Sequence, residues 1–203
     1  MGSINLQKGQ KIDLTKGNPG LTKLLIGLGW DEAPRAGGKG FLSGLLGGSG
    51  GSPIDCDASV IMLSANDKLT QKAHLVYFGN LKSPEGSIQH TGDNLTGAGE
   101  GDDEQILVDL SRIPAEIQKV VFVVNIYDCQ KRKQDFGLIS NAFIRVANSA
   151  TNQELCRFSL TDNYAGKTAL ICAEVYRYNN EWKFAAIGEG TTDASLGELV
   201  RRY

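Results

Sequence analysis

The chain has 203 residues, of which 41% are hydrophobic and 22% are charged, and this composition excludes a disordered protein and supplies the apolar material of a core. Its 21 Lys plus Arg against 23 Asp plus Glu give a formal net charge of −2, which argues against a dedicated nucleic-acid binder. No apolar run reaches the roughly 18 residues of a membrane helix, and no secretory signal opens the sequence, so we expect a cytoplasmic globular protein.

Short apolar stretches rich in β-branched and aromatic residues, with turn signals between them, predict strands along most of the chain. In chain order these stretches are 24–30, 60–63, 74–78, 106–110, 120–127, 142–147, 155–160, 169–176 and 182–187. The strand at 155–158 is expected to pair with the strand before residues 148–153. The segment 176–184 predicts a hairpin, because Asn179 and Asn180 tolerate the positive φ of a tight turn.

Helical signals are few and short: a turn at 114–117, a piece near Phe136 and a segment that starts at Asp193. Because no helix is expected between consecutive strands, the pattern predicts a mainly β protein, an antiparallel β-sandwich with a few short helices. Nothing marks an internal boundary, so residues 1–203 are expected to form a single domain. A Gly/Ser-rich insert at about 37–52 interrupts it, and its composition favours a surface loop.

The cysteines and histidines do not predict a zinc or redox site. Cys56, Cys129, Cys156 and Cys172 are scattered without a C-x-x-C pair, and there are only two histidines, His74 and His90. The last three cysteines lie in or beside apolar stretches, where core packing is the expected role. His74 is expected to be a packed histidine, and His90 precedes an acidic segment that it could orient by hydrogen bonding.

That acidic segment is the most informative feature of the sequence. Residues 92–104 carry five carboxylates interleaved with glycines: Asp93, Glu100, Asp102, Asp103 and Glu104. Carboxylates this close repel one another, so folding must raise their pKa values or supply a cation. Calcium takes about six to eight hard oxygen ligands from carboxylates, from amides such as that of Asn94 and from main-chain carbonyls. The segment therefore predicts a calcium site, against the alternative of a solvated acidic loop.

The segment does not follow the EF-hand pattern, because Leu95 and Ala98 occupy the positions of a ligand and of the required glycine. A second acidic pair, Asp55 and Asp57, precedes the apolar stretch at 60–63. Two acids at the start of a strand could reach a metal held at that end of a sandwich, and Asp31 is a third candidate from a strand end. No phosphate-binding glycine motif or serine-nucleophile motif is present.

Taken together, these motifs resemble the TerD family of tellurite-resistance and general-stress proteins. The residues that carry the resemblance span nearly the whole chain: the motifs at 6–14, 19–23, 28–31, 55–59, 90–104, 141–145 and 182–184. The resemblance implies a calcium-binding, non-catalytic cytoplasmic β-sandwich that acts with other stress and tellurite-resistance proteins, in a membrane-associated assembly. The departure is the Gly/Ser-rich insert, where usual members carry a shorter and more acidic segment.

Carried over residue by residue, the resemblance assigns eight calcium-associated positions: Asp31, Asp55, Asp57, Asp93, Asn94, Asp102, Asp103 and Glu104. Two other hypotheses remain open. A metal-dependent phosphoester hydrolase would require two neighbouring metals held by shared carboxylates. A metal-independent interaction domain would show no response to metal at all.

Overall fold

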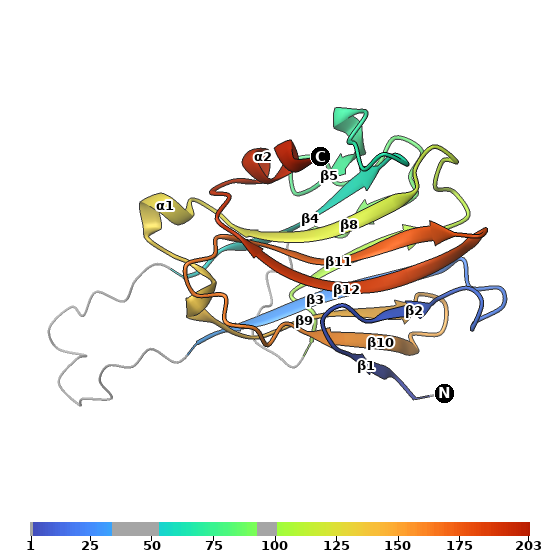
Figure 1. Ribbon diagram of the computed structural model, residues 1–203, viewed down its shortest axis with the longest axis horizontal. Coiled ribbons are helices and arrows are strands. Elements are labelled where there is room, and N and C mark those ends of the chain that lie inside the picture. Colours follow the sequence, from blue (N-terminus) through green and yellow to red (C-terminus); the bar gives the residue numbers. More distant parts are fainter. Residues whose placement is uncertain (1, 34–52, 93–100) are drawn as a thin grey trace, which may run out of the picture.

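The computed structural model describes residues 2–33, 53–92 and 101–203, which form two six-stranded sheets packed face to face (Figure 1). Sheet A has the order β1 (Ile4–Leu6), β10 (Glu154–Ser159), β9 (Ile139–Asn148), β3 (Lys23–Glu32), β7 (Glu104–Asp109) and β6 (Ile88–His90). Sheet B has the order β2 (Lys11–Asp13), β12 (Glu181–Thr191), β11 (Ala169–Tyr178), β8 (Lys119–Ile126), β4 (Cys56–Leu63) and β5 (Leu75–Val76).

This architecture confirms the predicted mainly β sandwich. Each of the nine predicted stretches overlaps a strand, and β10 pairs with β9 as expected. The hairpin between β11 and β12 turns at Asn179 and Asn180, with φ of 50° and 63°. The pairing is not antiparallel throughout, because the edge strand β1 lies parallel to β10. The sequence did not predict β1, β2 or β6, each of which has three residues and too little pattern to be recognised.

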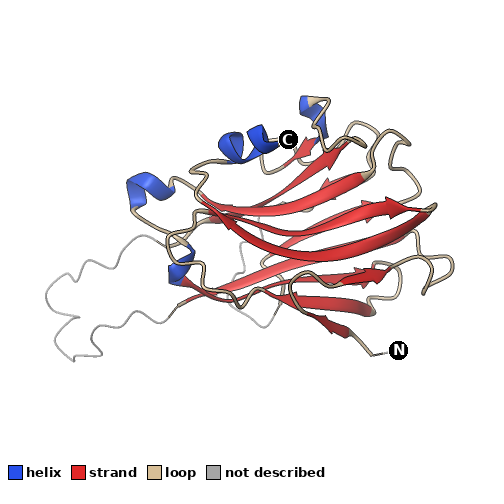
Figure 2. Ribbon diagram, in the orientation of Figure 1, coloured by secondary structure: helices blue, strands red, loops and turns tan. Residues whose placement is uncertain are grey.

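The helices in the described part of the chain are single turns at the periphery of the two sheets (Figure 2). They are η1 (Lys72–His74), α1 (Cys129–Arg132), η2 (Phe136–Leu138), α2 (Leu196–Leu199) and η3 (Val200–Arg202). None of them is long and apolar enough to cross a membrane.

The core follows from the alternation of side chains along the strands. Inward residues of both sheets, such as Leu24, Ile26 and Leu28 on β3, are almost completely buried. A second apolar cluster lies on the outer face of sheet B, where Val121 and Val123 of β8 pack with Leu199 of α2. All four cysteines are buried and free, as core packing requires.

The C-terminal segment that covers this outer face is fixed by an ion pair. Arg202 Nε donates to Asp193 Oδ2 over 2.7 Å. Burial acts to raise the pKa of Asp193, but the hydrogen bonds from Arg202 and Thr191 outweigh it and hold that pKa below its usual range.

The register of the sheets places several acidic residues at one end of the sandwich. In the antiparallel pair β3–β7, Leu28 lies opposite Glu104, so the end of β3 meets the start of β7. The start of β9 lies there too, with Ser140 opposite Asp31. A hydrogen bond between Glu104 and β4 brings the first residues of β4 to the same end.

Candidate metal centre

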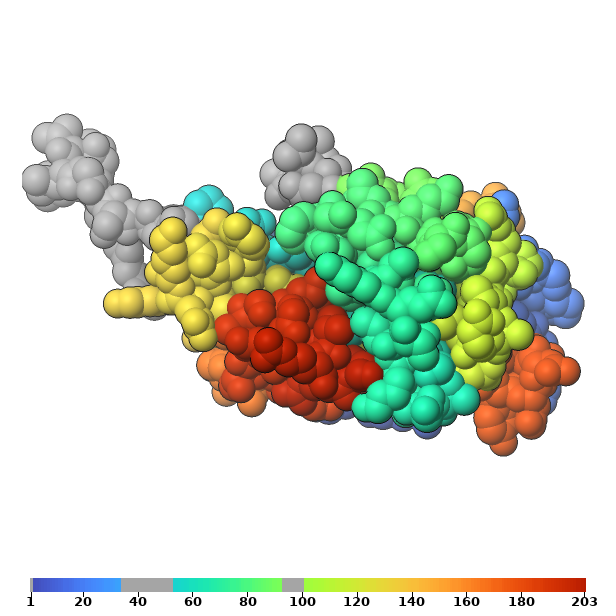
Figure 3. Space-filling model, turned by 90° about the horizontal axis from the view of Figure 1, so that it is seen from above, coloured from blue at the N-terminus to red at the C-terminus, as the bar shows by residue number. Residues whose placement is uncertain are grey.

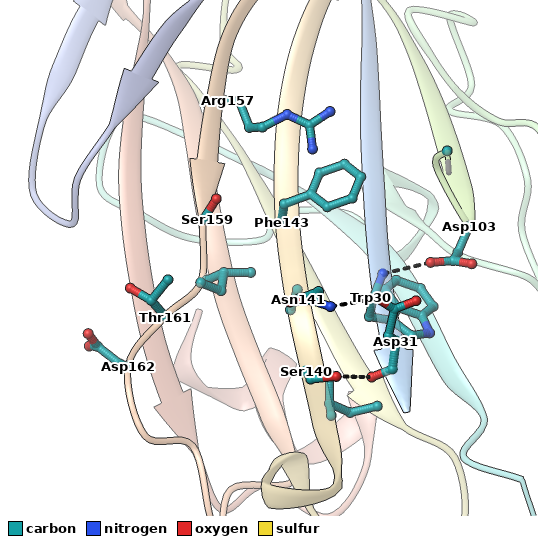
Figure 4. Close-up of a pocket in the computed structure, with 14 residues that line it drawn as sticks. Trp30, Asp31, Asp103, Ser140, Asn141, Phe143, Arg157, Ser159, Thr161 and Asp162 are labelled. Carbon is teal, nitrogen blue, oxygen red and sulfur yellow. Dashed lines mark hydrogen bonds between the residues drawn. The ribbon is translucent and has the colours of Figure 1, made fainter. Parts of the chain in front are cut away.

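Asp31 and Asp103 face a groove of about 730 Å³ at this end of sheet A (Figure 4). Asp103 Oδ2 accepts a hydrogen bond of 2.6 Å from the backbone N–H of Trp30. Asp31 Oδ2 accepts one of 2.8 Å from Nδ2 of Asn141, which also lines the groove. Two carboxylates and a side-chain amide from β3, β9 and the segment before β7 are therefore held in one place, with the backbone of Gly101 beside them.

Gly29 leaves the space that this arrangement needs. A Cβ at this position would lie 2.4 Å from the Phe143 ring and 3.0 Å from the carbonyl oxygen of Gly101. Any larger residue would push the ring, the Gly101 carbonyl, or both away from β3. The second glycine of the Gly-Leu-Gly-Trp sequence therefore lets the backbone of Gly101 lie against the sheet.

The carboxyl group of Asp103 is partly buried and lies near other carboxylates, and both conditions affect its pKa. Burial raises the pKa of its carboxyl, the hydrogen bond from Trp30 lowers it, and the charges of Asp31 and Asp102 raise it further, with a net increase. A bound cation would offset the free-energy cost of keeping this carboxylate ionised.

Asp102 has a different environment, although it is the neighbouring residue. Its carboxylate lies on the outer face of sheet A, where Arg145 Nε and Nη2 donate to its two oxygens over 2.6 Å each. Gln105 Nε2 donates to Oδ2 over 2.9 Å, and only 1% of the side chain is exposed. Beneath it is Gly27, where a Cβ would lie 2.1 Å from Asp102 Oδ1.

These contacts form a row across three strands. Gly27 of β3 lies opposite both Arg145 of β9 and Gln105 of β7 in the sheet register. The Asp102 carboxylate therefore spans the row and ties the residues just before β7 to the sheet. An arginine bound in this bidentate way already neutralises the charge of Asp102.

Glu104 links the two sheets. Its carboxylate is buried between them and accepts a 2.6 Å hydrogen bond from the backbone N–H of Ala58 on β4. His90 Nε2 lies 3.4 Å from the same oxygen. His90 Nδ1 accepts a hydrogen bond of 3.0 Å from the N–H of Gly92, the first residue of the acidic segment, whereas among the described residues its buried Nε2 has no hydrogen-bond partner.

Asp55 and Asp57 belong to the start of β4. Asp55 is exposed and its Oδ2 lies 3.5 Å from Arg132 Nη1. Asp57 pairs in register with Asn125 of β8 and lines a groove on the outer face of sheet B. Between them, burial of Cys56 raises the pKa of its thiol well above the usual range, and nearby carboxylates raise it further. These are Asp57, Glu104, Asp55 and Asp103, in order of effect.

The other two assigned residues, Asp93 and Asn94, lie outside the described residues. Among the residues that the structure does describe, no cluster of three or more His, Cys, Asp and Glu side chains could hold a metal ion. The six assigned residues that the structure describes thus divide by environment. Asp31 and Asp103 share a groove, Asp102 and Glu104 have protein partners, and Asp55 and Asp57 lie near the start of β4.

Three residues of this site were missed as site residues from the sequence. Asn141 and Arg145 both belong to the motif at 141–145, and the resemblance pointed to that motif without assigning them a role. Gly27 supplies the space for Asp102. The available signal was the spacing of Gly27 and Gly29, two residues apart and therefore on one face of a strand.

The TerD domain model matches residues 1–203, and the chain belongs to that family. It is 62% identical over 201 residues to "Stress response protein SCP2" of Bacillus subtilis (strain 168), which covers 99% of each chain. It is 40% identical over 201 residues to "Tellurium resistance protein TerD" of Serratia marcescens, covering 99% of this chain and 97% of that one.

A solved structure shows the same fold. The crystal structure of a homologue of telluride resistance protein (TerD) from Streptomyces coelicolor A3(2) matches with a TM-score of 0.61 and 24% identity. The match covers 84% of this chain and 90% of that one.

Proposed function

We propose that this protein is a calcium-binding stress-response module of the tellurium-resistance type, which acts without catalysis as part of a larger assembly. The stress and tellurium-resistance role follows from the names of its relatives and from a family match over the whole sequence. The calcium role rests on one observation, the convergence of Asp31 and Asp103 in a single groove.

The donors in this groove fit calcium in kind. Two carboxylates, the Asn141 amide and the Gly101 carbonyl are hard oxygen donors, which calcium prefers over nitrogen or sulfur. The described residues provide only some of the six to eight oxygens that calcium usually takes, so the remaining ligands would come from water or from other assigned residues such as Asp93 and Asn94. Bound calcium would supply the positive charge that relieves the repulsion between these carboxylates.

The residues around the groove prepare it for a cation. Arg145 holds Asp102, and the Ala58 N–H holds Glu104, so both ends of residues 102–104 are anchored to the sheets. Asp103, between them, is directed to β3 beside Asp31. Asp102 and Glu104 are therefore proposed to position the acidic segment, and Asp31 and Asp103 to bind the metal.

A binding role is favoured over hydrolysis. The two-metal mechanism needs carboxylates shared between metals about 4 Å apart. Of residues 102–104, Asp103 alone lines the groove, because Asp102 is bound by Arg145 and Glu104 is buried against β4. Neither relative named above carries an enzyme name.

Thermal melting in chelator and in calcium tests this proposal. A ligand that binds only the folded state stabilises it by about 2.7 kcal/mol at a hundredfold excess over its Kd. For a chain of this length that energy raises the Tm by about 5–10 °C. The increase should be lost in Asp31→Asn and Asp103→Asn.

Asp13→Asn is the matched control, because Asp13 lies on β2 and pairs with Lys183 far from the groove. It should retain the full calcium-dependent increase. A Tm that does not respond to calcium in the unsubstituted protein would rule the calcium role out and favour the metal-independent interaction domain.

A further inference from the structure

A second groove, of about 510 Å³, lies on the outer face of sheet B. Its floor is formed by β4 and β8, one wall by residues 75–78 and the other by residues 194–197. In Figure 3, which looks onto this face, the yellow, red and green segments that carry these residues come together. The lining is mostly apolar and includes Leu75, Tyr77 and Leu196.

The floor of this groove contains a buried polar group without a partner. Asn125 is only 7% exposed, and among the described residues its Oδ1 has no hydrogen-bond partner. Leaving a buried acceptor of this kind unsatisfied is unfavourable, so a ligand in the groove that donates to it gains binding energy.

The mouth of the groove carries two exposed aromatic residues. Phe78 is 58% exposed and Tyr127 is 48% exposed, and both line the groove. Tyr178 is similarly exposed but does not line the groove. Exposed aromatic side chains around a pocket are typical of protein-interaction hot spots.

The charges around the groove favour a basic partner. Among the described residues that line it are two carboxylates, those of Asp57 and Asp128, and one ammonium group, that of Lys72. Lys131 Nζ also lies 3.7 Å from Asp128 Oδ2, but the lysine side chain is 84% exposed, so this pair offsets little of the negative charge. Tyr127 already accepts a cation on its ring, since the Arg132 guanidinium lies 5.3 Å from the ring centre.

We propose that this groove docks an extended segment of a partner protein, with one apolar side chain buried between the walls and a basic residue beside it. The Asn125 amide pairs with a backbone amide of that segment, because it offers one donor and one acceptor in the same plane. The exposed rings of Phe78 and Tyr127 lie at the mouth of the groove. They can contact a chain that crosses the groove, but not a small molecule enclosed in it. The inference rests on the proposed role as a binding module and names the partner's chemistry.

An NMR titration of the full-length protein tests the inference. The probe is the peptide acetyl-Ala-Phe-Lys-Ala-amide, added in the presence of chelator so that calcium binding plays no part. We expect saturable shifts of the Asn125 side-chain amide and of Phe78, Tyr127 and Leu196, with a Kd on the order of 1 mM. Replacing the peptide's Phe by Ala should weaken binding at least about tenfold. Replacing its Lys by Glu, or methylating the Phe nitrogen, should also weaken it.

Protein variants provide the matched control. Phe78→Ser and Tyr127→Ser should weaken binding of the peptide. Tyr178→Ser should not, because Tyr178 is a similarly exposed aromatic residue outside the groove. Shifts confined to other surfaces, or equal binding of the Ala peptide, would overturn the proposal. Phenethylamine binding as tightly as the peptide would identify a small-molecule pocket and would also overturn it. Since calcium is absent, none of these results depends on the metal proposal.

Discussion

Replacing Asp102 by asparagine tests whether its carboxylate has a structural role or binds a metal. The two roles predict opposite effects on the stability of the metal-free protein. A ligand carboxylate is repelled by its neighbours when no metal is present, so its neutralisation leaves stability unchanged or increases it. A buried carboxylate held by an arginine is stabilising, and its neutralisation leaves the arginine without its counter-charge.

The structure sets the magnitude of the expected loss. Asp102 is 1% exposed and Arg145 is 17% exposed, and two hydrogen bonds of 2.6 Å join them. Breaking a buried pair of this kind costs about 3–5 kcal/mol. Glu154 lies 3.8 Å from Arg145 Nη1 and compensates part of the charge, so the lower value of about 3 kcal/mol applies. In a chain of this size, that loss lowers the Tm by about 6–12 °C.

Urea unfolding and thermal melting in excess chelator measure this effect. Asp103→Asn is the control in the same buffer, because its carboxyl is crowded by like charges and asparagine can still accept from Trp30. It should change stability by less than about 1 kcal/mol. Arg145→Met and the variant with both substitutions complete a double-mutant cycle. The double variant should lose less stability than the sum of the losses in the two single variants. A metal-free Asp102→Asn protein as stable as the unsubstituted one would refute the reasoning.

Three further predictions concern the residues that shape the fold around the site. In excess chelator, Glu104→Ala should destabilise the protein by about 3 kcal/mol, because it leaves a buried N–H unpaired between the sheets. Glu104→Gln should cost less, and urea unfolding measures both effects. Gly27→Ala should cost about 2 kcal/mol, since the new Cβ would lie 2.1 Å from a carboxylate oxygen. Gly101→Ala is the control for Gly27→Ala, because no atom of the described residues lies within 4 Å of its new Cβ. Asp193→Asn tests the pH dependence. The folded-state pKa of Asp193 is lowered, so its stabilisation is present above the ordinary value of 3.8 and is lost as the pH falls through the folded value. The difference in unfolding free energy between the two proteins should therefore shrink below that pH, and a difference that is constant with pH would contradict the assignment.

The sequence was sufficient to predict the sandwich, because long strands with one or two buried faces carry a clear apolar pattern. The ten residues of β3 and the eight of β8 are examples. The edge strands β1 and β2 have three residues each, and their partners are more than 150 residues away in the chain. No local pattern specifies such a contact. The parallel pairing of β1 was missed for the same reason.

The acidic segment was recognised from the sequence as a unit, but its individual roles were not. Asp102 and Asp103 are adjacent and chemically identical, and only the sheet register gives one of them Arg145 and the other the Trp30 N–H. Arg145 is 43 residues from Asp102. The sequence motif shows that many carboxylates lie close together. Which of them is neutralised depends on residues of neighbouring strands, such as Arg145, that are distant in the sequence.

Calorimetric titration of calcium into the chelator-stripped protein tests the central claim most directly, with magnesium as the comparison. The account predicts saturable binding of calcium in preference to magnesium, weakened at least about tenfold by Asp31→Asn or Asp103→Asn. A folded protein that takes up no calcium at millimolar concentration, or one whose calcium affinity is unchanged by both substitutions, would contradict it.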